Sequence, residues 1–165
     1  NTRIMCPYLP EDRRSKEDYV ALTDIFNKIG KRLSEEGMTF AYHNHDFELE
    51  KFDGKTGLDI LFDGTNPEYV KAELDVYWLS KAGENPVEWI KRYKDRLPLV
   101  HLKDMTIDDQ QFFAELGTGS IEFQPILDQG KESKVGWWVI EQDVCKRPPL
   151  ESVEMSINYL KTLDY

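Results

Sequence analysis

Four short apolar segments of this chain carry histidine or carboxylate side chains near their ends, and they recur at a regular interval. In chain order they are FAYHNHDFE at 40–48, AELDVYW at 72–78, VHLKD at 100–104 and WVIEQD at 138–143. The steps from His43 to Asp75, to His101 and to Glu141 are 32, 26 and 40 residues. A (β/α)8 barrel spends roughly 250 residues on eight units, about 30 on each. The interval therefore predicts one strand for each βα unit, with the polar side chain at the carboxyl end of that strand.

Helix-like segments separate these strands along the whole chain. The first helix has the clearest limits, because Ser15 and Asp18 form a weak capping-box pattern at its start and Gly37 follows its end. Strands are expected at 3–9, 38–45, 70–76, 98–102 and 136–141, and helices at 15–36, 57–63, 86–93, 122–130 and 150–162. Such alternation indicates parallel strands joined by helical crossovers. The strand stretches LPLV and WWVI are apolar on both faces, as strands buried on both sides tend to be.

The predicted fold is therefore α/β, of the (β/α)8 TIM-barrel type. Five strands at about 30 residues a unit account for the whole chain, whereas a closed barrel needs eight units. We expect a single domain, residues 1–165, that covers about five C-terminal βα units. An incomplete barrel leaves sheet edges and apolar faces open. The chain is therefore expected either to associate with a second copy of itself or to be a piece of a longer protein.

The overall composition narrows the classes of function. The 165 residues are 40% hydrophobic and 12% aromatic, which suits one domain with a core. No apolar run approaches the roughly 20 residues that cross a bilayer, so no membrane association is expected. The net charge of −10 argues against nucleic acid as a partner, because binding to phosphates requires basic side chains. The densest basic cluster, Arg13, Arg14 and Lys16, is interpreted as a solvated helix start.

Cysteine usage gives the expected compartment. Cys6 and Cys145 lie far apart and form no CxxC motif, which predicts buried or free thiols in a reducing, cytoplasmic environment. No signal peptide is visible, although the sequence begins at Asn1 rather than Met, which leaves its native start open.

Each candidate site residue also has a structural interpretation. His43 and His45 alternate along one predicted strand and so share a face, which suits a metal pair or two hydrogen-bonded polar residues in a barrel mouth. His101 sits between two apolar residues, as a core histidine does. Asp75 at a strand end is costly unless it is paired or bound to a cation. Glu141 follows four apolar residues and is hard to explain on the surface. Taken together, these residues lie in register at the carboxyl ends of four predicted strands. They therefore predict a site at the face of the barrel where active sites lie.

Two carboxylates with one or two imidazoles suit a divalent metal. Imidazole favours first-row transition metals and carboxylate favours Mg and Mn. The mixed set favours Mn(II), with Mg, Co, Fe or Zn as alternatives. Such an ion polarises a carbonyl or a vicinal pair of hydroxyls and stabilises an enediolate.

These segments resemble the sugar phosphate isomerase/epimerase superfamily, which has a xylose isomerase-like barrel. The matching pieces lie between residues 42 and 143 and are YHNHDFE, ELDVYW, HLKD, LGTGSIEF and VIEQD. Relatives include inosose dehydratases, ketose 3-epimerases and hydroxypyruvate isomerases. The resemblance implies a divalent metal held by Glu, Asp, His and Glu from four successive strands. Asp75, His101 and Glu141 match the last three positions, and His43 falls where the first Glu stands.

The resemblance also implies roles for the neighbouring residues. The fourth metal ligand is His43, His45 or Glu48, and the residues not used in this way are left as acid or base. The predicted catalytic residues are His43, His45, Glu141 and Lys103. The predicted metal ligands are Asp75, His101, Glu141 and His43. The predicted substrate contacts are Phe47, Glu48 and Trp78. Lys103 holds a substrate oxygen or is a surface lysine. The GTG loop at 117–119 is a tight turn or offers backbone N–H groups to an anion.

The predicted function is that of a metal-dependent sugar or polyol isomerase or epimerase, acting by proton abstraction next to a metal-bound carbonyl or hydroxyl. A dehydratase or lyase acting on a keto-sugar or inosose is the first alternative, and a non-catalytic barrel fragment is the second. A DNA-cleaving relative of the same fold is disfavoured, since it needs more metal ligands and a basic face. The expected partner is a small sugar or polyol, which the sequence does not name.

Overall fold

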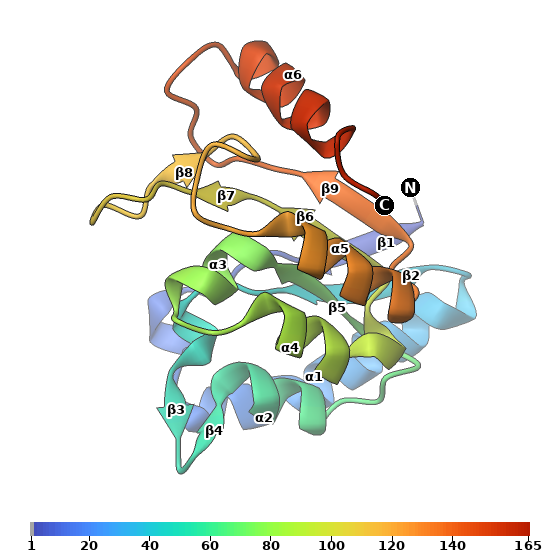
Figure 1. Ribbon diagram of the computed structural model, residues 1–165. Coiled ribbons are helices and arrows are strands. Elements are labelled where there is room, and N and C mark those ends of the chain that lie inside the picture. The colour runs from blue at the N-terminus through green and yellow to red at the C-terminus, as the bar shows by residue number, and fades with distance from the viewer. Residues whose placement is uncertain (1) are drawn as a thin grey trace. The chain divides into compact units, whose positions relative to one another are not determined.

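The computed structural model describes residues 2–165, and its elements follow the predicted alternation of strands and helices (Figure 1). The main strands are β1 (Arg3–Cys6), β2 (Thr39–His43), β5 (Val70–Asp75), β6 (Leu99–Leu102) and β9 (Trp137–Ile140). The helices are α1 (Lys16–Glu35), α2 (Gly57–Asp63), α3 (Val76–Lys81), α4 (Pro86–Arg92), α5 (Phe123–Glu132) and α6 (Pro149–Leu160). The sheet order is β1-β2-β5-β6-β9, which confirms the five predicted strands.

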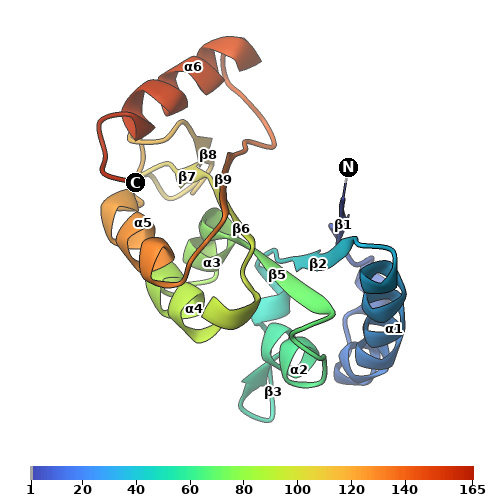
Figure 2. The same cartoon turned by 90° about the vertical axis from the view of Figure 1, so that its right-hand side faces the viewer.

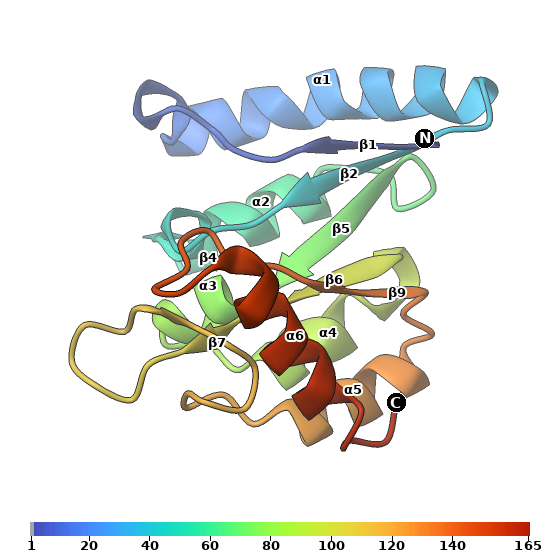
Figure 3. The ribbon, with the colours of Figure 1, turned by 90° about the horizontal axis from the view of Figure 1, so that it is seen from above.

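The chain divides into two compact units, the first ending at Glu73 and the second beginning at Leu74. In the first unit, β1 pairs in parallel with β2, and β2 pairs in parallel with β5. Helix α1 runs alongside β1 and packs on β2 and α2 (Figure 3). It starts at the predicted capping box of Ser15 and Asp18, and the chain leaves it through Gly37 at a φ of 71°. A short hairpin, β3 (Lys51–Phe52) and β4 (Lys55–Thr56), precedes α2.

In the second unit, β6 and β9 pair in parallel, and α4 and α5 lie side by side (Figure 2). The buried rings and aliphatic side chains of Trp89, Ile90, Phe123 and Leu127 form the core between these helices and the strands. A hairpin that the sequence did not predict, β7 (Asp104–Met105) and β8 (Phe113–Ala114), follows β6. Among the described residues, no helix has both the length and the apolar character needed to cross a membrane.

Four of the predicted strands are too long at the carboxyl end, the last of them by the single residue Glu141. The first ends at Cys6, before two prolines that cannot donate to a ladder. The second ends at His43, so His45 lies beyond it. The third ends at Asp75, because this side chain caps helix α3, which the sequence analysis missed. The strand at 137–140 is correct in position, but its predicted burial on both faces is wrong. Trp137 is 57% exposed, because β9 has only β6 as a neighbour in the sheet order.

The structure agrees with the predicted state of the two cysteines, and their predicted reducing, cytoplasmic environment stays a prediction. Cys6 and Cys145 are both free thiols. The prediction of a single domain stays a prediction.

Candidate active site

The second unit gathers three carboxylates around the side chain of Lys103. The Nζ atom lies 3.1 Å from Asp75 Oδ2 and 2.5 Å from Asp143 Oδ2, and it also contacts Glu141 Oε2. Lys103 is 1% exposed, so the alternative of a surface lysine is wrong. Burial by itself lowers the pKa of Lys103, but the charge of Asp75 and the bonds from Asp143 and Glu141 outweigh it and raise this pKa. The side chain is therefore an ammonium at neutral pH.

Asp75 is held in one orientation by the helix that it caps. Its Oδ1 atom accepts hydrogen bonds from the backbone N–H groups of Tyr77, at 2.9 Å, and Trp78, at 3.2 Å. Its Oδ2 atom lies 3.9 Å from His101 Nδ1, besides its contact with Lys103. The carboxylate is fully buried. The cap therefore fixes one oxygen and directs the other toward a cation and an imidazole.

Glu141 joins this cluster through the backbone ladder. Its N–H group donates to the carbonyl of Leu102 at 3.2 Å, one residue past the end of β9. His101 lies in β6, opposite Val139, with its side chain 16% exposed. Three carboxylates face a single ammonium here, so the cluster carries two formal negative charges in excess. The excess of carboxylates and the neighbouring imidazole of His101 are the types of ligand that divalent cations take.

Three aromatic rings surround the same ammonium. The Nζ atom of Lys103 lies 5.5 Å from the ring of Trp78, 5.7 Å from that of Tyr77 and 5.4 Å from that of Phe113. Trp78 was predicted to contact substrate. Phe113 was missed, because it comes from the hairpin after β6 and no strand period marks it. The rings offer an apolar wall beside the charged cluster.

In the first unit, the predicted histidine pair lies at the end of β2. His43 is the last residue of the strand, and its Nδ1 atom is 3.4 Å from Glu73 Oε1, its register partner in β5. His45 lies outside the strand, so the argument that both histidines share a strand face is wrong. The two imidazole rings are nevertheless 5.1 Å apart. The sequence analysis missed Glu73, although alternation from Asp75 along β5 places it on the same face.

Glu48 braces the loop that follows β2. It is fully buried and accepts hydrogen bonds from the Tyr42 hydroxyl at 2.6 Å and from the His45 N–H at 2.7 Å. Burial raises the pKa of Glu48 to about 7, against the two hydrogen bonds, which lower it. Phe47 stacks on His45, with ring centroids 5.4 Å apart. The predicted contact of Glu48 with substrate stays a prediction.

The GTG loop is a tight turn that encloses a buried carboxylate. The backbone N–H groups of Gly117 and Gly119 donate to Asp104 Oδ2, at 3.0 and 2.9 Å. Those of Met105 and Ile121 donate to Asp104 Oδ1. The alternative of an anion site on this loop is therefore wrong, because these N–H groups are already bonded to the side chain of Asp104.

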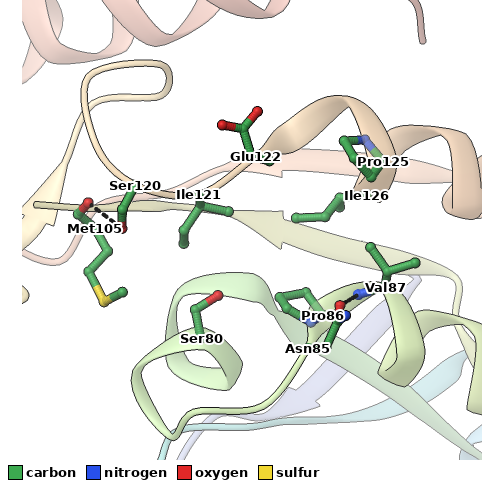
Figure 4. A pocket seen from close by; sticks show the side chains of 10 residues that line it. All are labelled: Ser80, Asn85, Pro86, Val87, Met105, Ser120, Ile121, Glu122, Pro125 and Ile126. Atoms are coloured by element: carbon green, nitrogen blue, oxygen red, sulfur yellow. Dashed lines mark hydrogen bonds between the residues drawn. The ribbon is translucent and has the colours of Figure 1, made fainter. Parts of the chain in front are cut away.

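A cavity of about 320 Å³ lies between α3, α4 and the start of α5, and none of the predicted site residues lines it (Figure 4). Its lining is Ser80, Asn85, Pro86, Val87, Met105, Ser120, Ile121, Glu122, Pro125 and Ile126. Ser80 and Ser120 donate to backbone carbonyls, and Asn85 caps α4 by accepting from the N–H of Val87. These three side chains are engaged with the backbone, so the charged cluster at the strand ends is the better candidate for chemistry.

Comparison with known proteins agrees with the fold and the order of these residues. The chain belongs to the xylose isomerase-like TIM barrel family, whose model matches residues 2–163. It covers about five units of the (β/α) barrel, which confirms the predicted fold class and the resemblance.

Relatives within this family narrow the class further. An inosose dehydratase of Clostridium botulinum is 30% identical over 166 residues, and one of Clostridium beijerinckii is 28% identical over 167 residues. Each alignment covers 89% of this chain and 55% of the relative, so the chain spans about half the length of these curated relatives. A solved structure of a sugar phosphate isomerase/epimerase from Parabacteroides distasonis superposes with a TM-score of 0.84 at 28% identity, covering 97% of this chain and 57% of that one.

Proposed function

We propose that this chain carries the strand-end site of an enzyme that removes a proton next to the carbonyl of a sugar or polyol ketone. The observation that carries the proposal is the buried Lys103 ammonium with the carboxylates of Asp75, Glu141 and Asp143 around it. A fixed positive charge with a carboxylate beside it suits a reaction in which negative charge develops on a substrate oxygen while a base takes a proton.

We further propose that the site binds a divalent metal, with Mn(II) first and Mg, Co, Fe or Zn as alternatives. Asp75, His101 and Glu141 are its proposed ligands. His43 at the carboxyl end of β2 is the proposed fourth, in the place where the family pattern has a Glu. When bound, the ion supplies a Lewis acid for the substrate oxygen.

The chain's own residues divide the remaining work. Glu141 acts as the base that takes the proton from the carbon next to the carbonyl. Lys103 holds the oxygen on which the enediolate charge develops, and Asp143 keeps Lys103 in place. His43 and His45 are the proposed acids, since imidazole changes its charge near neutral pH. Trp78 and Phe47 contact the apolar face of the substrate.

Two outcomes follow the shared first step. In a dehydratase, a histidine protonates the neighbouring hydroxyl, which leaves as water together with the electrons of its C–O bond. The names of the curated relatives favour this outcome, so inososes are the first substrates to assay. In an isomerase or epimerase, the proton returns to the neighbouring carbon or to the opposite face. The solved relative from Parabacteroides distasonis is named a sugar phosphate isomerase/epimerase, so ketoses and their phosphates form the second panel.

The test measures metal binding and proton exchange separately. Mn(II) binding is measured by titration calorimetry on the wild type, Asp75→Asn, Glu141→Gln and, as a control on an exposed face of α6, Glu154→Gln. We expect each ligand variant to bind Mn(II) at least about tenfold more weakly and the control to bind normally. Deuterium incorporation from D2O into inososes and ketoses is followed by NMR. A wild-type chain that binds no divalent ion would refute the metal site, and exchange unaffected by Glu141→Gln would refute the base.

A further inference from the structure

Two loops of the first unit meet in a cluster of rings around Arg14. The loop after β1 contributes Tyr8 and Arg14, and the loop after β2 contributes His45 and Phe47. Tyr8 meets His45 and Phe47 edge-on, at 5.4 and 5.7 Å between ring centroids, and the Arg14 guanidinium lies 3.5 Å from the centre of Phe47. Both loops follow the carboxyl ends of paired parallel strands, which is the face that carries the active sites of barrels.

Three of the five N–H groups of Arg14 hold the guanidinium in place. Nε donates to the carbonyl of Leu9 at 3.0 Å, and Nη2 donates to the same carbonyl at 2.8 Å and to the Tyr8 hydroxyl at 2.6 Å. Within residues 2–165, nothing accepts a hydrogen bond from Nη1. Since the Tyr8 oxygen accepts from Arg14, its own O–H remains a donor. The guanidinium is fixed, and two donors beside it are left for a ligand.

The charge of Arg14 is not matched by a carboxylate, unlike that of its neighbours. Arg13 pairs with Asp18 at 3.3 Å, and Lys16 pairs with Asp53 at 2.7 Å. No carboxylate of the part of the chain that the structure describes forms an ion pair with Arg14, which is half-buried. In a chain with a net charge of −10, a fixed cation without an acidic partner on this face points to an acidic ligand.

We propose that Arg14 and Tyr8 form a subsite for an oxyanion on the substrate, with the ring of Phe47 beside it as an apolar wall. The proposal rests on the proposed function and names its substrate class, a polyol that bears a carboxylate or a phosphate. The Nη1 group of Arg14 and the O–H of Tyr8 donate to two oxygens of that anion. The sequence analysis interpreted Arg14 as part of a solvated helix start, which its contacts do not support.

A purely structural role for Arg14 makes a different prediction. If the guanidinium only ties the β1 loop to Phe47, its loss weakens binding of neutral and anionic ligands alike. If it binds an oxyanion, its loss removes the preference for the anionic ligand and leaves neutral binding nearly unchanged. The preference is therefore the decisive quantity.

The experiment compares three matched ligands, D-sorbitol, D-gluconate and D-sorbitol 6-phosphate. Binding is followed by NMR titration at low salt, with metal removed on a chelating resin so that the result does not depend on turnover or on Mn(II). We expect gluconate, sorbitol 6-phosphate or both to bind the wild type at least about tenfold more tightly than sorbitol. The ligand that is preferred identifies the carboxylate or the phosphate as the recognised group.

Variants decide between the two roles. Arg14→Gln is expected to abolish the preference, Arg14→Lys to keep part of it, and Arg13→Gln, in the same loop, to keep all of it. Thermal unfolding of each variant verifies the fold. Equal weakening for all three ligands in Arg14→Gln, no preference in the wild type, or no binding of any of the three would overturn the subsite. Failure of Mn(II) binding or of deuterium exchange, by contrast, would count against the proposed function alone.

Discussion

The two units hold their polar residues in different ways. In the second unit, the buried Lys103 and Asp75 lie together at strand ends with the partly exposed Glu141 beside them, and a helix cap and a ladder bond fix the directions of the two carboxylates. In the first unit, rings and imidazoles lie on two loops, and a buried carboxyl group, Glu48, braces one of them. The second unit therefore concentrates its electrostatic energy in a few contacts between charged groups. The first unit spreads smaller packing and hydrogen-bond energies over many contacts.

This difference predicts how each unit responds to substitution. Removing one partner of a buried ion pair leaves a charge without compensation, so the loss is large. Removing one ring from an aromatic cluster costs only its share of packing, and each aromatic pair contributes about 0.5–1.5 kcal/mol beyond burial. The following predictions test the contrast at single residues.

The largest effect is expected for Lys103→Met, which leaves the fully buried Asp75 without its cation. We expect the free energy of unfolding of the metal-free protein to fall by about 3–5 kcal/mol, measured by urea denaturation. The control is Lys161→Met, an exposed lysine just after α6. If the proposed metal site is correct, Mn(II) restores part of the loss, because the ion takes over the positive charge. A loss below about 1 kcal/mol would show that the carboxylates do not depend on Lys103.

A smaller effect is expected for Asp104→Asn, in the same unit. The carboxylate of Asp104 accepts four backbone N–H groups, and the amide of Asn turns two of these contacts into opposed donors. We expect a loss of about 2–3 kcal/mol, since buried donors without acceptors are costly. Asp109→Asn, at an exposed position, serves as the control. Equal stability of the two variants would contradict the view that this carboxylate organises the GTG loop.

The features that the sequence predicted correctly are those that repeat along the chain. Strand ends repeat with the period of the fold, so the placement of Asp75 at the end of β5, of His101 in β6 and of Glu141 just past β9 followed from spacing. The alternation of strands and helices was predicted for the same reason. Both the strand ends and the alternation depend on a local sequence pattern, which the chain repeats in every βα unit.

The remaining features depend on contacts without a period. Glu73 lies outside the βα period and is marked only by its alternation with Asp75 along β5. Phe113 reaches Lys103 only because an unpredicted hairpin turns the chain back. The end of β2 before His45 was missed because the strand signal continues in sequence, while the buried Glu48 draws the N–H of His45 out of the ladder. Such side chain to backbone bonds compete with strands without leaving a periodic trace.

The smallest of the three effects is expected for Glu48→Gln, in the first unit, and it depends on pH. In the unfolded chain Glu48 loses its proton near the ordinary pKa of 4.5, whereas burial raises its pKa to about 7 in the folded chain. Between pH 4.5 and about pH 7 the folded chain keeps a proton on Glu48 that the unfolded chain has lost. The stabilisation of the folded state by this proton is complete below pH 4.5 and is lost as the pH rises through about 7. A glutamine at this position does not titrate, and it keeps both contacts when its amide oxygen accepts from the His45 N–H and its NH2 group donates to the Tyr42 hydroxyl oxygen, which can reverse its role. We therefore expect Glu48→Gln to gain roughly 2 kcal/mol of stability relative to the wild type between about pH 5 and about pH 8.

Urea denaturation at both pH values measures this gain, with the exposed Glu50→Gln as control. A pH-independent difference between wild type and Glu48→Gln would mean that the buried carboxyl group is ionised throughout, and that the first unit holds a buried charge as the second does.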